Sequence, residues 1–266
     1  MQGRLLPKYK GRYQAHPINY WEDEFQKAKD LGLDCIEFIL DFDDYNLNPL
    51  SNEDGINKIK RVSDSHEIGV HSICADYFME SPLHGHNVKS ANESKEVLEE
   101  LIKASYSLGV ENIVIPCVDQ SSLKNQQDKD LFVSALNEVI PLAEDNGIFL
   151  SLETDLAPKE FRILLDELNS KCVKVNYDIG NSAGLGFDLL EELEEYGDFI
   201  SDVHIKDRLL DGPSVMLGEG NANFKLFFDT LLTYKYKGIF IMQAYRDEEG
   251  VEIFKTQLDF IKPFIN

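Results

Sequence analysis

The chain has few of the features that mark a secreted or membrane-spanning protein. Its four cysteines show no Cys-x-x-Cys spacing and each lies in or beside an apolar run, so we expect buried, reduced thiols at Cys35, Cys74, Cys117 and Cys172. No apolar run approaches the roughly 18 residues that cross a bilayer. The opening residues also lack the long apolar segment of a signal peptide. These absences predict a cytoplasmic protein with no membrane partner.

Basic charge is also scarce. The chain has 26 Lys and Arg against 48 Asp and Glu, a formal net charge of -22. Proteins that bind nucleic acid without reading its sequence depend on cations that neutralise phosphates, so this balance opposes a nucleic-acid partner. An anionic substrate would need its own local cluster of cations.

No Gly-x-Gly-x-x-Gly fingerprint supports an open dinucleotide-binding sheet. Instead, a helical pattern that ends in glycine directly before an apolar strand recurs at Gly32, Gly109, Gly147 and Gly238. With a short first strand near residues 2–5 and a third at 69–75, the pattern gives eight strand–helix units. Residues 1–266 are therefore predicted to form one α/β domain, a (β/α)8 TIM barrel, whose usual length is about 250 residues.

Four apolar runs in the second half of the chain end in a side chain that can bind a metal. These residues are Glu153, Asp178, His204 and Gln243. In a barrel of parallel strands the functional groups lie at the carboxyl ends of the strands, so we expect the four to converge. Oxygen donors with one imidazole favour a single divalent ion, such as manganese, magnesium, cobalt or zinc, over a thiolate site.

Other polar side chains near predicted strand ends are candidate contacts for a substrate. Lys206 and Arg208 follow His204 and suit a hydroxyl or phosphate, although charges of a solvated loop are an equal alternative. Glu37 interrupts an apolar strand, so it is expected either to point into the mouth of the barrel or to pair internally. His71, Glu219, Arg246 and Arg4 complete the set.

Several motifs carry a family resemblance. Leu152-Glu153-Thr154, Tyr177-Asp178-Ile-Gly-Asn181, Val203-His204-Ile-Lys-Asp207 and Leu217-Gly-Glu-Gly220 resemble motifs of the xylose-isomerase-like TIM barrels. Within that superfamily the chain is similar to sugar and sugar-phosphate isomerases and epimerases. The resemblance covers essentially the whole chain and is strongest from residue 147 to the end.

The resemblance implies a function and a mechanism. Members bind one divalent ion through a Glu, Asp, His and Glu quartet, which places the first three ligands on Glu153, Asp178 and His204. The expected activity is isomerisation or epimerisation of a small ketose or sugar phosphate. A proton is removed next to a metal-bound carbonyl, which gives an enediolate, and Glu153 is the expected base. The implied partner is a small carbohydrate, phosphorylated or not, and a homodimer is the assembly that similar barrels suggest.

The fourth ligand position departs from the family, because it falls on Gln243. An amide can still coordinate a metal, but it carries no charge and cannot accept a proton. The ion is therefore expected to bind more weakly, and the return proton must come from another group or from Glu153 itself, which would give aldose–ketose isomerisation. The candidate donors are Asp155, His71, His86 and Glu219.

Two other functions remain open on the sequence. The change at Gln243 is compatible with a catalytically drifted barrel that only binds a sugar. A phosphodiesterase of the apurinic endonuclease type is less favoured, because its three-metal cluster needs more histidines and carboxylates at strand ends, where only His71 is well placed. The negative charge of the chain also opposes a DNA substrate.

Overall fold

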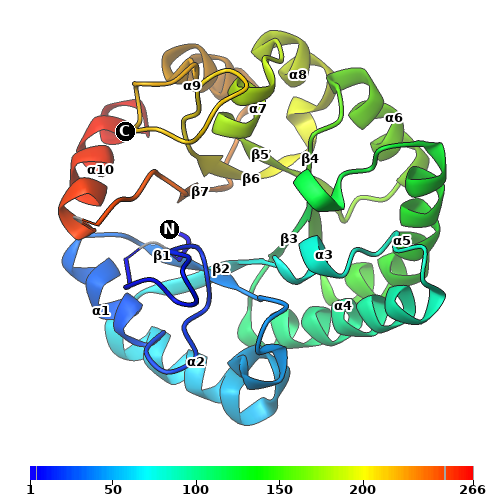
Figure 1. The fold of residues 1–266 in the computed structure, drawn as a ribbon, viewed down its shortest axis with the longest axis horizontal. Helices are drawn as coiled ribbons and strands as arrows, with labels where there is room; N and C mark the ends of the chain where they lie inside the picture. The colour runs from blue at the N-terminus through cyan, green and yellow to red at the C-terminus, as the bar shows by residue number, and fades with distance from the viewer. Residues whose placement is uncertain (4, 249, 266) are drawn as a thin grey trace.

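A parallel sheet curves into a barrel at the centre of the molecule, and helices form a ring around it (Figure 1). The computed structural model describes residues 1–3, 5–248 and 250–265. Its strands are β1 (Cys35–Ile39), β2 (Gly69–Cys74), β3 (Asn112–Cys117), β4 (Phe149–Thr154), β5 (Val173–Asp178), β6 (Ile200–Ile205) and β7 (Ile239–Met242). Each strand pairs in parallel with the next one in sequence. This order confirms the predicted α/β TIM barrel.

The predicted first strand near residues 2–5 is reduced to a single bridge at Gln2. Gln2 pairs in parallel with Glu37 of β1, and its N–H donates to the carbonyl of Met242 at the end of β7 (3.3 Å). Gly3 then takes a φ of +53°, which ends the extended conformation. The barrel therefore has seven regular strands in the described residues, and Gln2 spans the gap between β7 and β1.

Ten α-helices cover the barrel in the part of the chain that the structure describes. They are α1 (Asp23–Asp30), α2 (Glu53–His66), α3 (Tyr77–Glu80), α4 (Val88–Leu108), α5 (Gln126–Asn146), α6 (Pro158–Leu168), α7 (Ile179–Leu185), α8 (Leu189–Tyr196), α9 (Phe224–Leu231) and α10 (Val251–Ile265). Short 3-10 turns join them: η1 (Tyr45–Leu47), η2 (Pro49–Ser51), η3 (Asp119–Ser121), η4 (Gly197–Phe199) and η5 (Leu232–Tyr234). Side chains of Asn52, Asn87 and Asn125 cap α2, α4 and α5 by accepting from backbone N–H groups of the first turn.

Three of the four predicted glycine joints are confirmed. Gly109 and Gly147 follow α4 and α5 with φ of 76° and 67°, and Gly32 follows α1 in the same left-handed region. The prediction for Gly238 was wrong, because the left-handed residue after η5 is Lys235. A Cβ on Gly238 would lie 2.4 Å from the carbonyl oxygen of Ser201, so glycine there permits close packing of β7 against β6.

The apolar faces of the helices pack on the outside of the barrel. Phe25, Phe132, Phe227 and Phe254 are among the largest side chains that are fully buried there. All four cysteines are free and buried, as the sequence predicted. Among the described residues, no helix combines the length and the apolar character needed to cross a bilayer.

Candidate metal and substrate site

The four predicted metal ligands lie together at one end of the barrel. Glu153, Asp178 and His204 come from β4, β5 and β6, and one donor atom of each lies within 4.8 Å of the others. His204 Nδ1 is 3.9 Å from Glu153 Oε2. Gln243 follows β7, and its Nε2 is 3.3 Å from the same His204 nitrogen. Parallel strands align their carboxyl ends, which explains how residues up to 90 positions apart in the chain (Glu153 to Gln243) come together.

The donor set fits a divalent cation. Gln243 Nε2 donates to Gln2 Oε1 (2.7 Å), whereas the buried Gln243 Oε1 has no hydrogen-bond partner in the described part of the chain. A buried carbonyl oxygen without a partner is costly, and coordination to a cation would satisfy it. Two carboxylates, an imidazole and this amide oxygen together supply the hard donors that manganese, magnesium or zinc accept.

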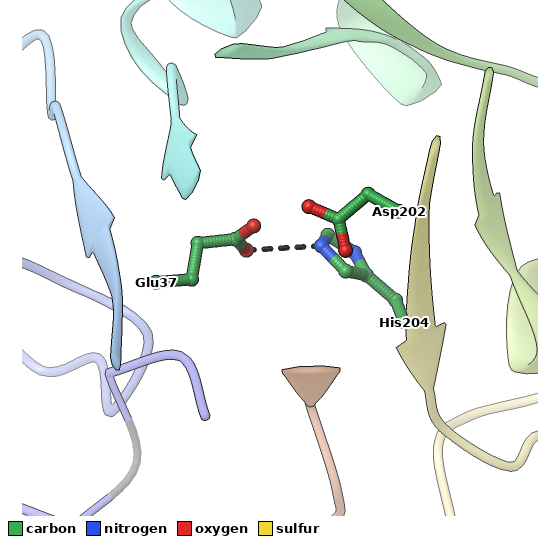
Figure 2. Close-up of side chains that lie close together, drawn as sticks. All are labelled: Glu37, Asp202 and His204. Atoms are coloured by element: carbon green, nitrogen blue, oxygen red, sulfur yellow. Dashed lines mark ion pairs between the residues drawn. The ribbon is translucent and has the colours of Figure 1, made fainter. Parts of the chain in front are cut away.

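Glu37 holds His204 in place from the interior of the barrel. Figure 2 shows the two side chains pointing toward each other from β1 and β6, with His204 Nε2 at 2.9 Å from Glu37 Oε1. Ser72 Oγ donates to the other oxygen of Glu37 (2.6 Å). Glu37 pairs internally, which is one of the two placements that the sequence left open, and it does not line the cavity described below. A carboxylate that binds one ring nitrogen orients the other nitrogen toward a metal.

The interior charges set the protonation of His204. Burial opposes its positive charge, but the carboxylate of Glu37, with those of Glu153 and Asp202, outweighs burial and raises the pKa of His204 to about 10. A metal must therefore displace a proton from this ring.

Asp202 is a buried acid that the sequence analysis missed. It lies two positions before His204 on β6, so both side chains face the barrel interior, beside Glu37 (Figure 2). Neither of its carboxylate oxygens has a hydrogen-bond partner among the described residues. Burial, with the nearby Glu37, raises the pKa of Asp202 well above its ordinary value. The signal was present in the run Asp202-Val-His204, where an acid interrupts an apolar strand.

Asn181 connects the acidic ligands to the cations of the site. Its backbone N–H donates to Asp178 Oδ1 (2.7 Å), which caps α7, and its Nδ2 donates to Glu153 Oε1 (2.6 Å). Its Oδ1 accepts from Lys206 Nζ (3.0 Å) and Arg208 Nη1 (3.1 Å). Asn181 belongs to a motif quoted from the sequence, but its role depends on contacts that the sequence does not reveal.

Glu153 is electrostatically suited to exchange protons near neutral pH. Burial and the adjacent Asp178 raise the pKa of Glu153 to about 7, against the opposing effects of His204 and Lys206. A base works best when its pKa lies near the working pH.

A cavity of about 520 Å³ opens over this group. Its lining includes Arg12, Asp76, Glu153, Lys206, Arg208 and Gln243. Lys206 also lies 3.3 Å from Asp178 Oδ2, and Arg208 binds the carbonyl of Gly212. The volume suits a small polar ligand, and the lining offers both cations and carboxylates to it.

Several other predicted residues lie away from this cavity. His71 is exposed in the amino-terminal half of β2 and lines a separate cavity with Asp34 and Cys35. Glu219 is exposed in the loop before α9. The structure therefore does not bring these two together with Glu153.

The remaining candidates form contacts with other residues or lie outside the described residues. Arg246 donates to the carbonyl of Leu6 (2.6 Å) and lies over the ring of Tyr13, which does line the cavity. His86 pairs with Asp128 (3.1 Å), and Asp155 accepts from Ser122. Arg4 lies outside the described residues.

Comparison with known proteins gives the family. A family model described as a xylose isomerase-like TIM barrel matches residues 25–264. The chain belongs to this family. L-ribulose-5-phosphate 3-epimerase UlaE of Salmonella typhi, a curated relative, is 25% identical over 257 residues, which cover 91% of this chain and 89% of that protein.

Solved structures share the same fold. The apo 3-keto-D-glucoside 4-epimerase YcjR from E. coli matches with a TM-score of 0.74 at 18% identity, over 91% of this chain and 94% of that one. A xylose isomerase-like TIM barrel protein from Mycobacterium smegmatis in complex with magnesium matches with a TM-score of 0.73 at 17% identity, over 94% of this chain and 89% of that one.

Proposed function

We propose that this xylose isomerase-like barrel is a divalent-metal-dependent epimerase or isomerase of a small ketose or ketose phosphate. The observation that carries the proposal is the convergence of Glu153, Asp178 and His204 within 4.8 Å, together with a cavity that Glu153 lines with Gln243, Lys206 and Arg208. The name of the curated relative, an epimerase of a ketose phosphate, supports the same substrate class.

The roles follow from the contacts. Glu153, Asp178, His204 and Gln243 would hold the ion, which when bound would supply a Lewis acid that draws electrons from a carbonyl oxygen. Glu153 removes the proton from the carbon beside that carbonyl, and Asn181 Nδ2 holds the carboxylate in place through its Oε1. Lys206 and Arg208 bind a hydroxyl or a phosphate of the substrate. Glu37 keeps the His204 ring oriented.

Incubation in deuterium oxide tests the activity. The protein with Mn²⁺ is mixed separately with L-ribulose 5-phosphate, D-psicose, D-tagatose and D-fructose, and deuterium at carbons beside the carbonyl is followed by NMR. Incorporation that Glu153→Gln abolishes supports the proposal. If none of a wider panel of ketopentoses, ketohexoses and their phosphates gains deuterium, the proposed chemistry is excluded.

Metal content tests the site without a substrate. We expect one Mn²⁺ per chain, with binding strongly weakened in Glu153→Ala and His204→Ala but retained in Glu67→Ala, a surface variant whose carboxylate pairs only with Lys29. No binding at millimolar Mn²⁺ would favour the alternative that Gln243 suggests, a sugar-binding barrel without catalysis.

A phosphodiesterase of the apurinic endonuclease type finds no support in this arrangement. In the described part of the chain, His204 is the single histidine of the proposed metal site. His71, the histidine that the sequence placed nearest, lines a different cavity.

A further inference from the structure

The cavity contains a second buried carboxyl group, Asp76, that neither the sequence motifs nor the proposed metal set uses. Asp76 follows β2 directly and is only 8% exposed, yet it lines the cavity together with Glu153 and Gln243. The other acidic residue of the lining, Asp119, is exposed on η3. Among the described residues that line the cavity, Asp76 is thus the one sheltered carboxyl besides the expected base.

No cation forms a direct ion pair with Asp76 among the described residues, and the charge of Arg12 offsets that of Asp76 only in part. Its Oδ1 accepts from the thiol of Cys74 (3.2 Å) and its Oδ2 from Gln14 Nε2 (3.3 Å). No lysine, arginine or histidine of the described residues forms an ion pair with it, because the nearby Arg12 pairs with Asp41 instead. Burial, with the adjacent Asp41, raises the pKa of Asp76 to about 6. A carboxyl in this range can deliver a proton near neutral pH.

Asp76 and Glu153 reach the cavity from different strands. Asp76 lies after the end of β2, at the residue before α3, and Glu153 lies in β4; β3, whose residue Pro116 also lines the cavity, lies between β2 and β4 in the sheet. A ligand carbon held in the cavity can therefore meet the two carboxyl groups from two directions. Gln243, where the family has its second carboxylate, cannot donate or accept this proton.

We propose that Asp76 is the second acid–base group of the reaction, which returns a proton to the face of the carbon opposite Glu153. This inference rests on the proposed function. Glu153 takes the C–H proton while the electron pair stays on the substrate as an enediolate. The O–H bond of Asp76 then breaks as a new C–H bond forms. Nothing is oxidised or reduced, and both carboxyl groups recover their starting protonation by exchange with water.

The wild-type protein gives the first test, with L-ribulose 5-phosphate and D-psicose as probes in deuterium oxide with Mn²⁺. Two acid–base groups deliver solvent deuterium to the inverted carbon, so the first epimer formed is fully labelled there. A single base that both removes and returns the proton would carry part of the original hydrogen into the epimer, and that result overturns the proposal.

Asp76→Asn gives the second test. We expect epimer formation to fall at least ~100-fold, because a general acid contributes about 10² to 10⁴ in rate. Deuterium exchange into recovered substrate through Glu153 should persist within a few-fold of wild type, and Mn²⁺ affinity should stay within about twofold, since Asp76 is outside the proposed metal ligands. Asp119→Asn should leave the ratio of epimerisation to exchange unchanged.

The outcomes separate this inference from the proposed function. Equal losses of exchange and epimerisation in Asp76→Asn, or no loss of either, overturn the role of Asp76 while exchange by the wild type still supports the function. Deuterium exchange without any epimer in the wild type also overturns the role of Asp76 and still supports the proposed function. If no probe exchanges deuterium, both the role of Asp76 and the proposed function are excluded. If Asp76→Asn fails to fold, Asp76→Ser replaces it, and a ratio of epimerisation to exchange equal to that of wild type in this variant, which has no carboxyl group, counts against the proposal.

Discussion

Binding of a divalent ion to this site is expected to release protons, and Glu37→Gln is expected to reduce that release. With a pKa of about 10, His204 carries close to one displaceable proton at pH 7, and Glu153, with a pKa of about 7, carries about half of one. Mn²⁺ binding at pH 7 should therefore release about 1.5 protons. The competition at His204 alone weakens the apparent affinity at pH 7 by about a thousandfold, or about 4 kcal/mol.

Glu37→Gln has two opposite effects on the affinity for Mn²⁺. It removes the competition between the proton and the metal at His204, which strengthens binding, and it removes the group that orients the His204 ring, which weakens binding. Glu37 is the main group that raises the pKa of His204, at 2.9 Å from Nε2, so Glu37→Gln should leave the buried ring neutral at pH 7 and lower the release to about 0.5 proton. Loss of the orienting carboxylate should weaken intrinsic affinity about 10- to 100-fold. The variant should thus bind Mn²⁺ more tightly than wild type near pH 7 and more weakly above pH ~10, where no competition remains.

Isothermal titration calorimetry measures both quantities. Titrations of Mn²⁺ at pH 6, 7 and 8, each in two weakly coordinating buffers of different ionisation enthalpy, give the proton count from the dependence of the heat on the buffer, and the affinities give the slope against pH. Glu67→Gln, on the surface, serves as the matched control and should behave as wild type. A wild-type release below about half a proton at pH 8, where Glu153 contributes little, would refute the reasoning. Release of equal numbers of protons by Glu37→Gln and wild type would also refute it.

Three further predictions address the fourth ligand, a buried acid and the core. Gln243→Glu adds a carboxylate to the donor set and should tighten Mn²⁺ binding at least ~10-fold in the same titration; a change below twofold would mean that position 243 does not contact the ion. Burial raises the pKa of Glu24 to about 7, so the folded protein holds this proton longer than the unfolded chain, and the free energy of unfolding should fall by about 3 kcal/mol as pH rises from about 4.5 to 7. Urea unfolding at pH 5 and 8 should show a smaller loss of stability in Glu24→Gln than in wild type, by about 3 kcal/mol, because Glu153 and Asp76 still contribute in the variant. Equal losses in the two proteins would contradict the prediction. Phe227→Ala removes a fully buried ring stacked on Tyr177 and should cost about 3–5 kcal/mol in urea unfolding, whereas a cost below about 1 kcal/mol would show that the core refills the space.

Much of the architecture was readable from the sequence because it depends on local patterns. Short apolar runs alternate with amphipathic helices, and glycine after α4 and α5 takes the left-handed conformation that ends a helix. The reduction of the predicted first strand to a single bridge was not readable, because the pairing of so short a segment depends on its neighbours. Gln2 bridges β1 and β7, and the left-handed Gly3 stops the extension.

The sequence by itself determined which side chains meet at the site, since residues at the ends of parallel strands share one end of a barrel. Glu153, Asp178, His204 and Gln243 follow from that rule alone. Tertiary structure decided which groups support them. The pairing of Glu37 with His204, the four contacts of Asn181 and the place of Asp76 in the cavity join segments far apart in the chain. These contacts depend on side-chain directions and on burial within the closed barrel, and no local pattern encodes either.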